Sequence, residues 1–433
     1  MHARLTILVI FILCVCCAQV QHGIFLGPHN LPKKHYQQTN KNIYDNPNRS
    51  PIIFSGGLSG GSLMFKKDNM KGEPFPCFST TRNFYQGWIN LLEIIPKISQ
   101  PCFLLDIKPE FVNGTVRSRE GLTVIPKDFG GSEGVTYLGS APLGKKIGPY
   151  MLGFFNFLIE NAGYKLGVDL RAANYDWRLG PKEFARPNGD YANLKSLVED
   201  TYLKNNNKKV HLMGHSMGGP YLQTFLATFV SQEWKDRYIA SMISLGGSFA
   251  GAPMTAIQMT AGTDFGVSIF DTGALRGIIR NLGGAGWMLP SPNDDVMIMT
   301  AARNYTSAQM KELFHDMGSP DTYAIYKSES EAGDKTKAPN VPVHCLYGVG
   351  TPTLTGAYFS SLNPDKENAT RLIYKEGDQT VPLYSLTLCD DFAKKQDQQK
   401  YPVVVDRYRN VTHISIISDM IIFKRVLEIV TNK

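Results

Sequence analysis

The stretch Val210-His211-Leu212-Met213-Gly214-His215-Ser216-Met217-Gly218 holds the pattern Gly-x-Ser-x-Gly directly after a short apolar run, which is typical of a buried strand. Between this pattern and residue 234, apolar side chains recur at the spacing of a helix face: Tyr221, Leu222, Phe225, Leu226, Phe229 and Val230. Between a strand and a helix, the pattern lifts the serine hydroxyl above the edge of a sheet. The sequence therefore predicts an α/β fold in which Ser216 is a nucleophile.

The rest of the chain repeats the alternation of strand and helix patterns. Short β-rich apolar runs lie at residues 51–54, 168–170, 239–243, 343–347 and 372–374, and a last helical pattern runs from residue 413 to residue 430. This alternation is typical of a parallel sheet covered by helices. The chain has 433 residues, 43% of them apolar and 19% charged, which suffices for a large core. Because no repeat or linker divides it, we expect one domain over residues 19–433.

Two stretches, residues 60–130 and residues 250–340, break the alternation. Insertions in an open α/β sheet leave the sheet at strand ends, where sites are built. We therefore expect residues 60–130 to form an added subdomain. Residues 250–340, rich in Gly, Met and Thr, are expected to form a cap or lid.

A serine nucleophile needs a histidine that takes its proton, and in this fold the histidine follows both the serine and the acid. Three histidines lie after Ser216. His344 lies inside an expected strand, and His315 precedes the strand that should carry the acid. His413 follows an expected strand end and opens the last helical pattern, so we assign it as the base.

The acid should lie on a turn just after a strand. Asp378 follows the apolar run at residues 372–374 in this way. Glu376 is the alternative, but it stands on the strand side of Gly377. We therefore assign Asp378 as the residue that orients the base.

The oxyanion formed during ester cleavage needs two backbone N–H donors, one from the residue after the nucleophile and one from a loop after an early strand. Met217 supplies the first. Ser55-Gly56-Gly57-Leu58 follows the first expected strand, and we assign the Gly57 N–H as the second donor. The same run is not a phosphate-binding loop, because no Lys-Ser or Lys-Thr follows at the required spacing.

The beginning of the chain has the layout of a secretory signal peptide over residues 1–18: a positive charge, an apolar run and small residues. Removal of the signal peptide would take away three of the seven cysteines. The remaining four, Cys77, Cys102, Cys345 and Cys389, allow three pairings. We favour Cys77 with Cys102 and Cys345 with Cys389, because both pairs close short local loops.

Potential N-glycosylation sites agree with a secretory route to lysosomes or to the outside of the cell. They begin at Asn113, Asn304, Asn368 and Asn410, and a fifth, at Asn48, is weakened by a proline directly after its serine. After the signal peptide, no apolar run reaches the roughly 18 residues that span a bilayer, so we expect the mature chain to be soluble.

The formal net charge is +7, and the basic residues are scattered without an arginine-rich arm. This pattern disfavours nucleic acid as a partner. A mild positive surplus fits contact with anionic membrane surfaces as well as an ordinary solvated surface.

An apolar stripe lies between the first two of these cysteines. At helical spacing, one face would carry Phe84, Trp88, Leu91, Leu92 and Ile95. Such a stripe is usually core. In an insertion closed by a disulfide, it is equally consistent with an interfacial membrane-docking helix, and we assign Trp88, Leu91 and Leu92 to membrane binding.

Taken together, these motifs resemble those of the lecithin:cholesterol acyltransferase and lysosomal phospholipase A2 family over nearly all of the chain after the signal peptide. They comprise the loop at residues 55–58, Tyr175-Asp176-Trp177-Arg178 with the residues before it, the Ser216 motif, residues 345–350, Asp378-Gln379-Thr380-Val381-Pro382, and His413. The resemblance implies an α/β-hydrolase core with a disulfide-clipped membrane-binding subdomain and a mobile lid. It places Asp176 and Arg178 in polar contacts linked to the lid.

The activity that the resemblance implies is removal of an acyl chain from a phospholipid and its transfer to water or to a lipid alcohol, at a membrane or lipoprotein surface. No metal or organic cofactor is implied. The rivals are a neutral lipase or thioesterase on the same fold and a lipid-binding protein without catalysis. The chain departs from the family at Gly57, where the family has a side chain that is acidic in the lysosomal enzyme, and at Ser55 and Gln379.

Overall fold

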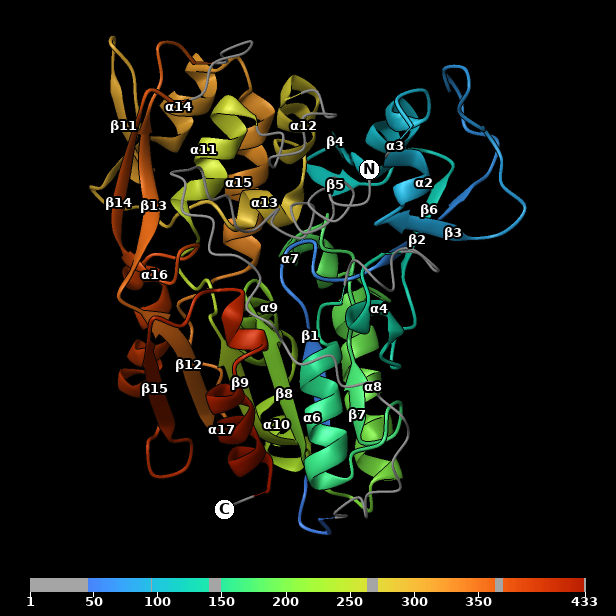
Figure 1. Ribbon diagram of the computed structural model, residues 1–433, viewed down its shortest axis with the longest axis vertical. Coiled ribbons are helices and arrows are strands. Elements are labelled where there is room, and N and C mark those ends of the chain that lie inside the picture. The colour runs from blue at the N-terminus through green and yellow to red at the C-terminus, as the bar shows by residue number, and fades with distance from the viewer. Residues whose placement is uncertain (1–45, 95, 140–148, 263–271, 363–368, 432–433) are drawn as a thin grey trace, which may run out of the picture.

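A six-stranded parallel sheet forms the centre of the molecule in a computed structural model that describes residues 46–94, 96–139, 149–262, 272–362 and 369–431 (Figure 1). Its order is β15-β12-β9-β8-β1-β7, and every neighbouring pair is parallel. The strands are β1 (Ile52–Ser55), β7 (Leu170–Ala172), β8 (Val210–His215), β9 (Ile239–Leu245), β12 (Val343–Val349) and β15 (Val403–Arg409). The predicted parallel α/β core is confirmed.

Helices cover both faces of this sheet, because successive strand residues point to opposite sides. Ile52 and Phe54 pack with α6 (Leu152–Ala162) and α17 (Met420–Thr431), which lie in front of the sheet in Figure 1. Ile53 points the other way, into the core with α8 (Asp190–Lys204), α9 (Gly218–Thr224) and α10 (Gln232–Tyr238). The apolar runs of the central strands β1 and β8 are uninterrupted because both faces of these strands are buried.

The strand order sets where a site can form. From β1 the chain crosses to β7 on one side, and then returns to β8 on the other side of β1. Loops that leave β1 and β8 therefore diverge, and a crevice opens at their carboxyl ends. The loop with Gly57 and the turn with Ser216 both lie at this crevice.

The subdomain predicted at residues 60–130 lies outside the central sheet. It contains an antiparallel sheet of β3 (Tyr85–Trp88), β2 (Leu63–Lys67) and β6 (Leu122–Pro126), a hairpin of β4 (Glu110–Val112) and β5 (Thr115–Arg117), and the helices α2 (Leu91–Ile94) and α3 (Gln100–Ile107). The Cys77–Cys102 disulfide ties the loop between β2 and β3 to α3. This disulfide is one of the two that the sequence predicted.

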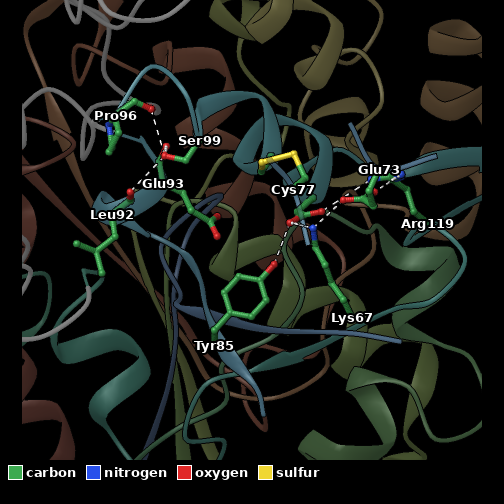
Figure 2. The surroundings of a disulfide bond; sticks show 11 residues. Lys67, Glu73, Cys77, Tyr85, Leu92, Glu93, Pro96, Ser99 and Arg119 are labelled. Atoms are coloured by element: carbon green, nitrogen blue, oxygen red, sulfur yellow. Dashed lines mark hydrogen bonds and ion pairs between the residues drawn. A yellow bond between two sulfur atoms is a disulfide. The ribbon is translucent and has the colours of Figure 1, made fainter. Parts of the chain in front are cut away.

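A group of paired charges lies next to this disulfide (Figure 2). Lys67 Nζ is 2.7 Å from Asp106 Oδ2 and 2.9 Å from Glu73, and Arg119 is 2.7 Å from Glu73. Burial, followed by the charge of Asp106, raises the pKa of Glu93 on α2 to about 7, against the opposing effect of Lys67. The charged side chains next to the disulfide are thus paired. The carboxyl group of Glu93, by contrast, is more easily protonated than an ordinary glutamate.

A second sheet and five helices form the cap. The sheet has the order β11-β10-β13-β14, with β10 (Val296–Met299), β11 (Asn304–Thr306), β13 (Thr351–Tyr358) and β14 (Arg371–Gly377). The helices are α11 (Pro253–Ala261), α12 (Thr272–Ile279), α13 (Gly283–Trp287), α14 (Met310–Asp316) and α15 (Pro320–Ala332). Residues 372–374, expected in the parallel sheet, instead pair antiparallel with β13, so the cap extends past the predicted end at residue 340.

Three further short α-helices are α4 (Glu133–Thr136), α7 (Pro181–Phe184) and α16 (Leu383–Leu386). Within the described residues, none of the helices has the length and apolar character needed to cross a bilayer. The predicted signal peptide at residues 1–18 lies outside the described residues.

Candidate active site

Ser216 lies on a strained turn between β8 and α9, with φ at 58°. Two glycines make this turn sterically possible. A Cβ on Gly214 would come within 2.4 Å of the Gly218 oxygen, and one on Gly218 would come within 2.3 Å of the Ser55 oxygen. The chain thus needs both glycines of the motif so that the serine turn can fit against α9 and β1.

The loop after β1 lies directly against this serine. A Cβ on Gly57 would be 2.8 Å from Ser216 Cβ and 3.2 Å from its Oγ, so the close approach itself requires glycine. The Gly57 N–H donates to the Tyr150 hydroxyl at 3.4 Å. Met217 lies at the start of α9, where the first amide N–H groups have no acceptor within the helix. Both N–H groups assigned to the oxyanion therefore lie beside the nucleophile.

His413 and Asp378 form a buried pair. His413 Nδ1 is 2.8 Å from Asp378 Oδ2, and each side chain is about 1% exposed. The Asp378 carboxylate is held by two further donors, because its Oδ1 accepts the N–H groups of Thr380 at 3.0 Å and Val381 at 2.7 Å. The His413 N–H also donates to the Asp378 carbonyl oxygen at 2.7 Å. The carboxylate can only accept from Nδ1, which leaves Nε2 of a neutral ring as an acceptor.

His413 Nε2 is buried and has no hydrogen-bond partner within the described part of the chain. A buried polar atom without a partner costs free energy, and in native proteins such atoms gather at functional sites. The Asp378–His413 pair lies close to the loop after β9, because a Cβ on Gly246 would be 3.3 Å from both Asp378 Oδ2 and His413 Nδ1. The Nε2 lone pair is thus available for a proton from an alcohol.

Two details of this site differ from the sequence prediction. Asp378 follows a strand, as predicted, but the strand is β14 of the cap sheet. His413 does not open the last helix, because a 3₁₀ turn at Ser415–Ile417 precedes α17, which begins at Met420. A loop places the base where the sequence pattern indicated a helix start. The alternative acid, Glu376, is exposed and accepts the Gly350 N–H at 3.2 Å.

A small pocket, with a volume of about 40 Å³, opens at Ser216. Its other lining residues are Leu58, Ser248, Ala252, Met254, Thr255, Gln258, Met288, Thr380 and Val381. Most of these side chains are apolar or carry a long apolar portion, and several come from α11 of the cap. The apolar lining suits contact with an acyl chain at the serine, for which this small pocket would have to widen.

Arg178 makes polar contacts both to the cap and to the disulfide-clipped subdomain. Its carbonyl oxygen accepts the N–H of Gly283, the first residue of α13 in the cap, at 2.7 Å. The Arg178 guanidinium is fully buried and pairs with Asp176 at 2.7 Å. It also donates to Ser118 Oγ at 2.7 Å and to the Asp106 carbonyl oxygen at 3.2 Å. The Arg178 side chain thus joins the loop after β7 to the disulfide-clipped subdomain, while its backbone contacts the cap.

The assignment of Trp88 to membrane binding is wrong. Residues 85–88 form a strand, and only four residues, Leu91–Ile94, are helical. The Trp88 side chain is 7% exposed, its Nε1 donates to the Ser59 oxygen at 2.8 Å, and its ring stacks on Phe103. Leu92, by contrast, is 80% exposed, while the side chain of Leu91 lies outside what the structure describes. The indole has its partner inside the protein and is not available to a bilayer.

Other predicted sites are distributed over the surface. Asn113, Asn304 and Asn410 are exposed, and Asn368 lies outside the described residues.

Cys345 is bonded to Cys389, which completes the predicted pairing. The described residues contain no group of three or more His, Cys, Asp or Glu side chains suited to a metal ion.

The sequence did not reveal the roles of His215 and Tyr150. The Tyr150 hydroxyl is 2.6 Å from His215 Nδ1, and His215 Nε2 is 2.9 Å from the His413 carbonyl oxygen. Burial and the neighbouring His413 lower the pKa of His215 to about 3. The histidine inside the Gly-x-Ser-x-Gly motif is thus a neutral, buried side chain that contacts the loop of the base.

The sheet order, the strained serine turn and the buried His–Asp pair at the carboxyl ends of the strands define an α/β-hydrolase. A family model described as lecithin:cholesterol acyltransferase matches residues 84–337 and 323–420. The chain belongs to this family, as its motifs indicated. The match includes the Ser216, Asp378 and His413 positions, whereas Gly57 precedes it.

Curated relatives match most of the chain. Phosphatidylcholine-sterol acyltransferase of Gallus gallus is 29% identical over 374 residues, which cover 85% of this chain and 87% of that protein. Lysosomal phospholipase A and acyltransferase of Homo sapiens is 29% identical over 392 residues, covering 87% of this chain and 90% of that protein.

Proposed function

We propose that this protein is a serine-dependent phospholipase A and O-acyltransferase. Membership of the lecithin:cholesterol acyltransferase family and the names of the relatives support phospholipid acyl transfer. The observation that carries the proposal is the buried His413 ring: Asp378 holds its Nδ1, and its buried Nε2 has no hydrogen-bond partner among the described residues.

In the first half of the reaction, the Ser216 hydroxyl loses its proton to His413 Nε2 as its oxygen attacks the ester carbonyl of a glycerophospholipid. The N–H groups of Met217 and Gly57 bind the oxyanion that forms. When the carbon–oxygen bond of the ester breaks, His413 returns the proton to the leaving lysophospholipid. An acyl group then remains on the serine as an ester.

In the second half, water or a lipid alcohol takes the place of the leaving group. His413 accepts its proton, the oxyanion forms again, and the serine leaves with the proton that His413 returns. Water gives a free fatty acid, and an alcohol gives a new ester. An alcohol competes with water only if it is held next to the acyl carbon, which the apolar side chains of Met254 and Met288 favour.

The lipid surface is proposed to bind exposed apolar side chains of the disulfide-clipped subdomain, and the buried Trp88 is not one of them. Four apolar side chains of this subdomain are strongly exposed: Phe75 at 94%, Phe78 at 76%, Leu92 at 80% and Ile98 at 66%. Phe75 and Phe78 flank Cys77 in the sequence, and Leu92 lies on α2, which packs against α3, the helix that carries Cys102. Large exposed apolar side chains on a rigid support suit an interfacial membrane contact.

The proposed location is the secretory pathway, with the mature enzyme in lysosomes or outside the cell. Two disulfides favour an oxidising compartment. Of the four favoured glycosylation sites, the three whose asparagines are described, Asn113, Asn304 and Asn410, are all exposed and hence accessible to glycan transfer.

The experiment that tests this function uses purified protein and phosphatidylcholine vesicles, with and without a long-chain alcohol, ceramide or sterol. We expect free fatty acid in all samples and an acylated alcohol where an acceptor is present, and neither product with Ser216→Ala. Activity on triacylglycerol or thioesters but not on phospholipid would favour a neutral lipase or thioesterase. A protein that binds vesicles but never reacts with a fluorophosphonate would be a lipid-binding protein.

A further inference from the structure

A chain of hydrogen bonds runs behind Ser216 from the oxyanion loop to the loop of the base. It begins at the Gly57 N–H, 3.4 Å from the Tyr150 hydroxyl, and continues over 2.6 Å to His215 Nδ1. It ends where His215 Nε2 lies 2.9 Å from the carbonyl oxygen of His413. Four residues from separate segments are therefore linked through two side chains.

The chemistry of the groups fixes the direction of every bond in this chain. A carbonyl oxygen can only accept, so His215 Nε2 must carry the proton that it donates to His413. Because His215 is buried and neutral, its Nδ1 is then an acceptor, and the Tyr150 hydroxyl must donate to it. The phenol oxygen has lone pairs left, and it accepts the Gly57 N–H.

This arrangement fixes the backbone of the base from both sides. The His413 N–H donates to the Asp378 carbonyl oxygen at 2.7 Å, and its carbonyl oxygen accepts from His215. The His215 and His413 rings lie 4.8 Å apart, with a 38° angle between their planes. His215 directly precedes the nucleophile in the sequence, so the position of the base relative to Ser216 depends on this side chain.

The Gly57 end of the chain bears on the oxyanion. Its bond to Tyr150 is long, and an oxyanion is a stronger acceptor than a phenol oxygen. The Tyr150 hydroxyl can therefore hold the Gly57 amide next to Ser216 until the developing oxyanion, as the stronger acceptor, takes over the N–H. A Cβ on the neighbouring Gly60 would be 3.1 Å from the same hydroxyl, so the loop packs closely around it.

We propose that Tyr150 and His215 are positioning residues of the acyl-transfer reaction, which act as one unit to hold the Gly57 amide and the His413 loop in register with Ser216. This inference rests on the proposed function and extends it to two side chains that do not touch the reacting atoms. Misplacement of catalytic groups by about 1 Å can cost a factor of roughly 100 in rate, so the link affects chemistry more than binding.

The test compares Tyr150→Phe with Tyr164→Phe. Tyr164 is a matched control, because its buried hydroxyl donates to the Ser50 oxygen at 2.7 Å, a contact outside the site. On a short soluble nitrophenyl ester, Tyr150→Phe should lower kcat by about 10- to 100-fold with KM within about twofold, and slow the reaction with a fluorophosphonate in proportion. Tyr164→Phe should keep the wild-type kcat even if its melting temperature falls as much as that of Tyr150→Phe.

A double-mutant cycle tests whether the two residues act as one unit. If they do, His215→Leu and the double variant with Tyr150→Phe should lose similar factors in kcat, because the link is already broken by either change. Losses that multiply would overturn the inference. If His215→Leu does not fold, the comparison of Tyr150→Phe with Tyr164→Phe decides alone.

The inference and the proposed function fail in different ways. If the wild-type enzyme is active and Tyr150→Phe keeps a kcat within twofold of wild type, only the positioning role is refuted. The same holds if Tyr164→Phe loses as much kcat as Tyr150→Phe. A wild-type protein that neither hydrolyses esters nor reacts with a fluorophosphonate refutes the proposed function itself.

Discussion

Replacing Asp378 by asparagine should disable the base without disturbing the fold, because of the way the carboxylate is held. Its Oδ1 accepts the backbone N–H groups of Thr380 and Val381, and its Oδ2 faces His413 Nδ1 at 2.8 Å. The two backbone donors require an oxygen at the first position. The asparagine amide must therefore turn its NH₂ group toward His413.

An NH₂ group can only donate, so His413 Nδ1 must become the acceptor and Nε2 must carry the proton. In this tautomer the ring cannot take a proton from Ser216. In serine hydrolases of this kind, such a change lowers kcat by about 10⁴-fold, which corresponds to about 5.4 kcal/mol in the activation free energy. Because the shape and the backbone hydrogen bonds stay the same, the melting temperature should change little.

The assay is hydrolysis of a short soluble nitrophenyl ester, which separates chemistry from membrane binding. Glu376→Gln is the matched control, since it makes the same chemical change at the exposed carboxylate two residues away and should keep wild-type kcat. Retention of more than a tenth of wild-type kcat by Asp378→Asn, or a large loss in Glu376→Gln, would refute the assignment of the acid.

Three further outcomes are expected. Leu92→Asp should weaken sedimentation with phosphatidylcholine vesicles while sparing hydrolysis of the soluble ester, whereas equal losses would show that Leu92 serves the fold. Loss of the Cys345–Cys389 bond, which closes a loop with a sequence separation of 44, should lower the free energy of unfolding by about 4 kcal/mol in denaturant titrations. Burial and Asp106 raise the pKa of Glu93 to about 7, so the stabilisation that comes from its protonated form is complete below about pH 4.5 and is lost as the pH rises through 7. The melting temperature of Glu93→Gln minus that of wild type should therefore increase from pH 5 to pH 8. A difference that stays constant over this range would contradict the prediction.

The parts of the molecule that follow from local patterns were predictable from the sequence. The strand before Ser216 and the helix after it are adjacent in the chain, and the two glycines of the motif report a backbone constraint that any such turn has. The parallel sheet followed from uninterrupted apolar runs, because strands buried on both faces show no alternation. The order of nucleophile, acid and base in this fold, together with the expected strand ends, made Asp378 and His413 the candidates for acid and base.

Contacts between distant segments could not be read in this way. The stripe from Phe84 to Ile95 has helical spacing, yet pairing of β3 with β2 overrides it, and Trp88 packs on Phe103 instead of facing out. Nothing in the spacing of residues 372–374 distinguishes a strand of the central sheet from one of the cap sheet. The link through Tyr150 and His215 depends on side-chain directions across a separation of 65 residues.

The sheet to which the acid belongs limits which part of the cap can move. β12 of the central sheet runs through Gly350 directly into β13 of the cap sheet, and β14, which ends just before Asp378, is paired along β13. The Gln379 N–H also donates to Thr353 Oγ1 on β13 at 2.9 Å. A motion that carried β13 and β14 outward would pull Asp378 away from His413. The pocket at Ser216 has a second wall from α11, which includes Met254 and carries no part of the triad. Because α11 packs on β13 but carries no part of the triad, we expect that displacing α11 from β13 would widen the pocket while the acid and the base stay together.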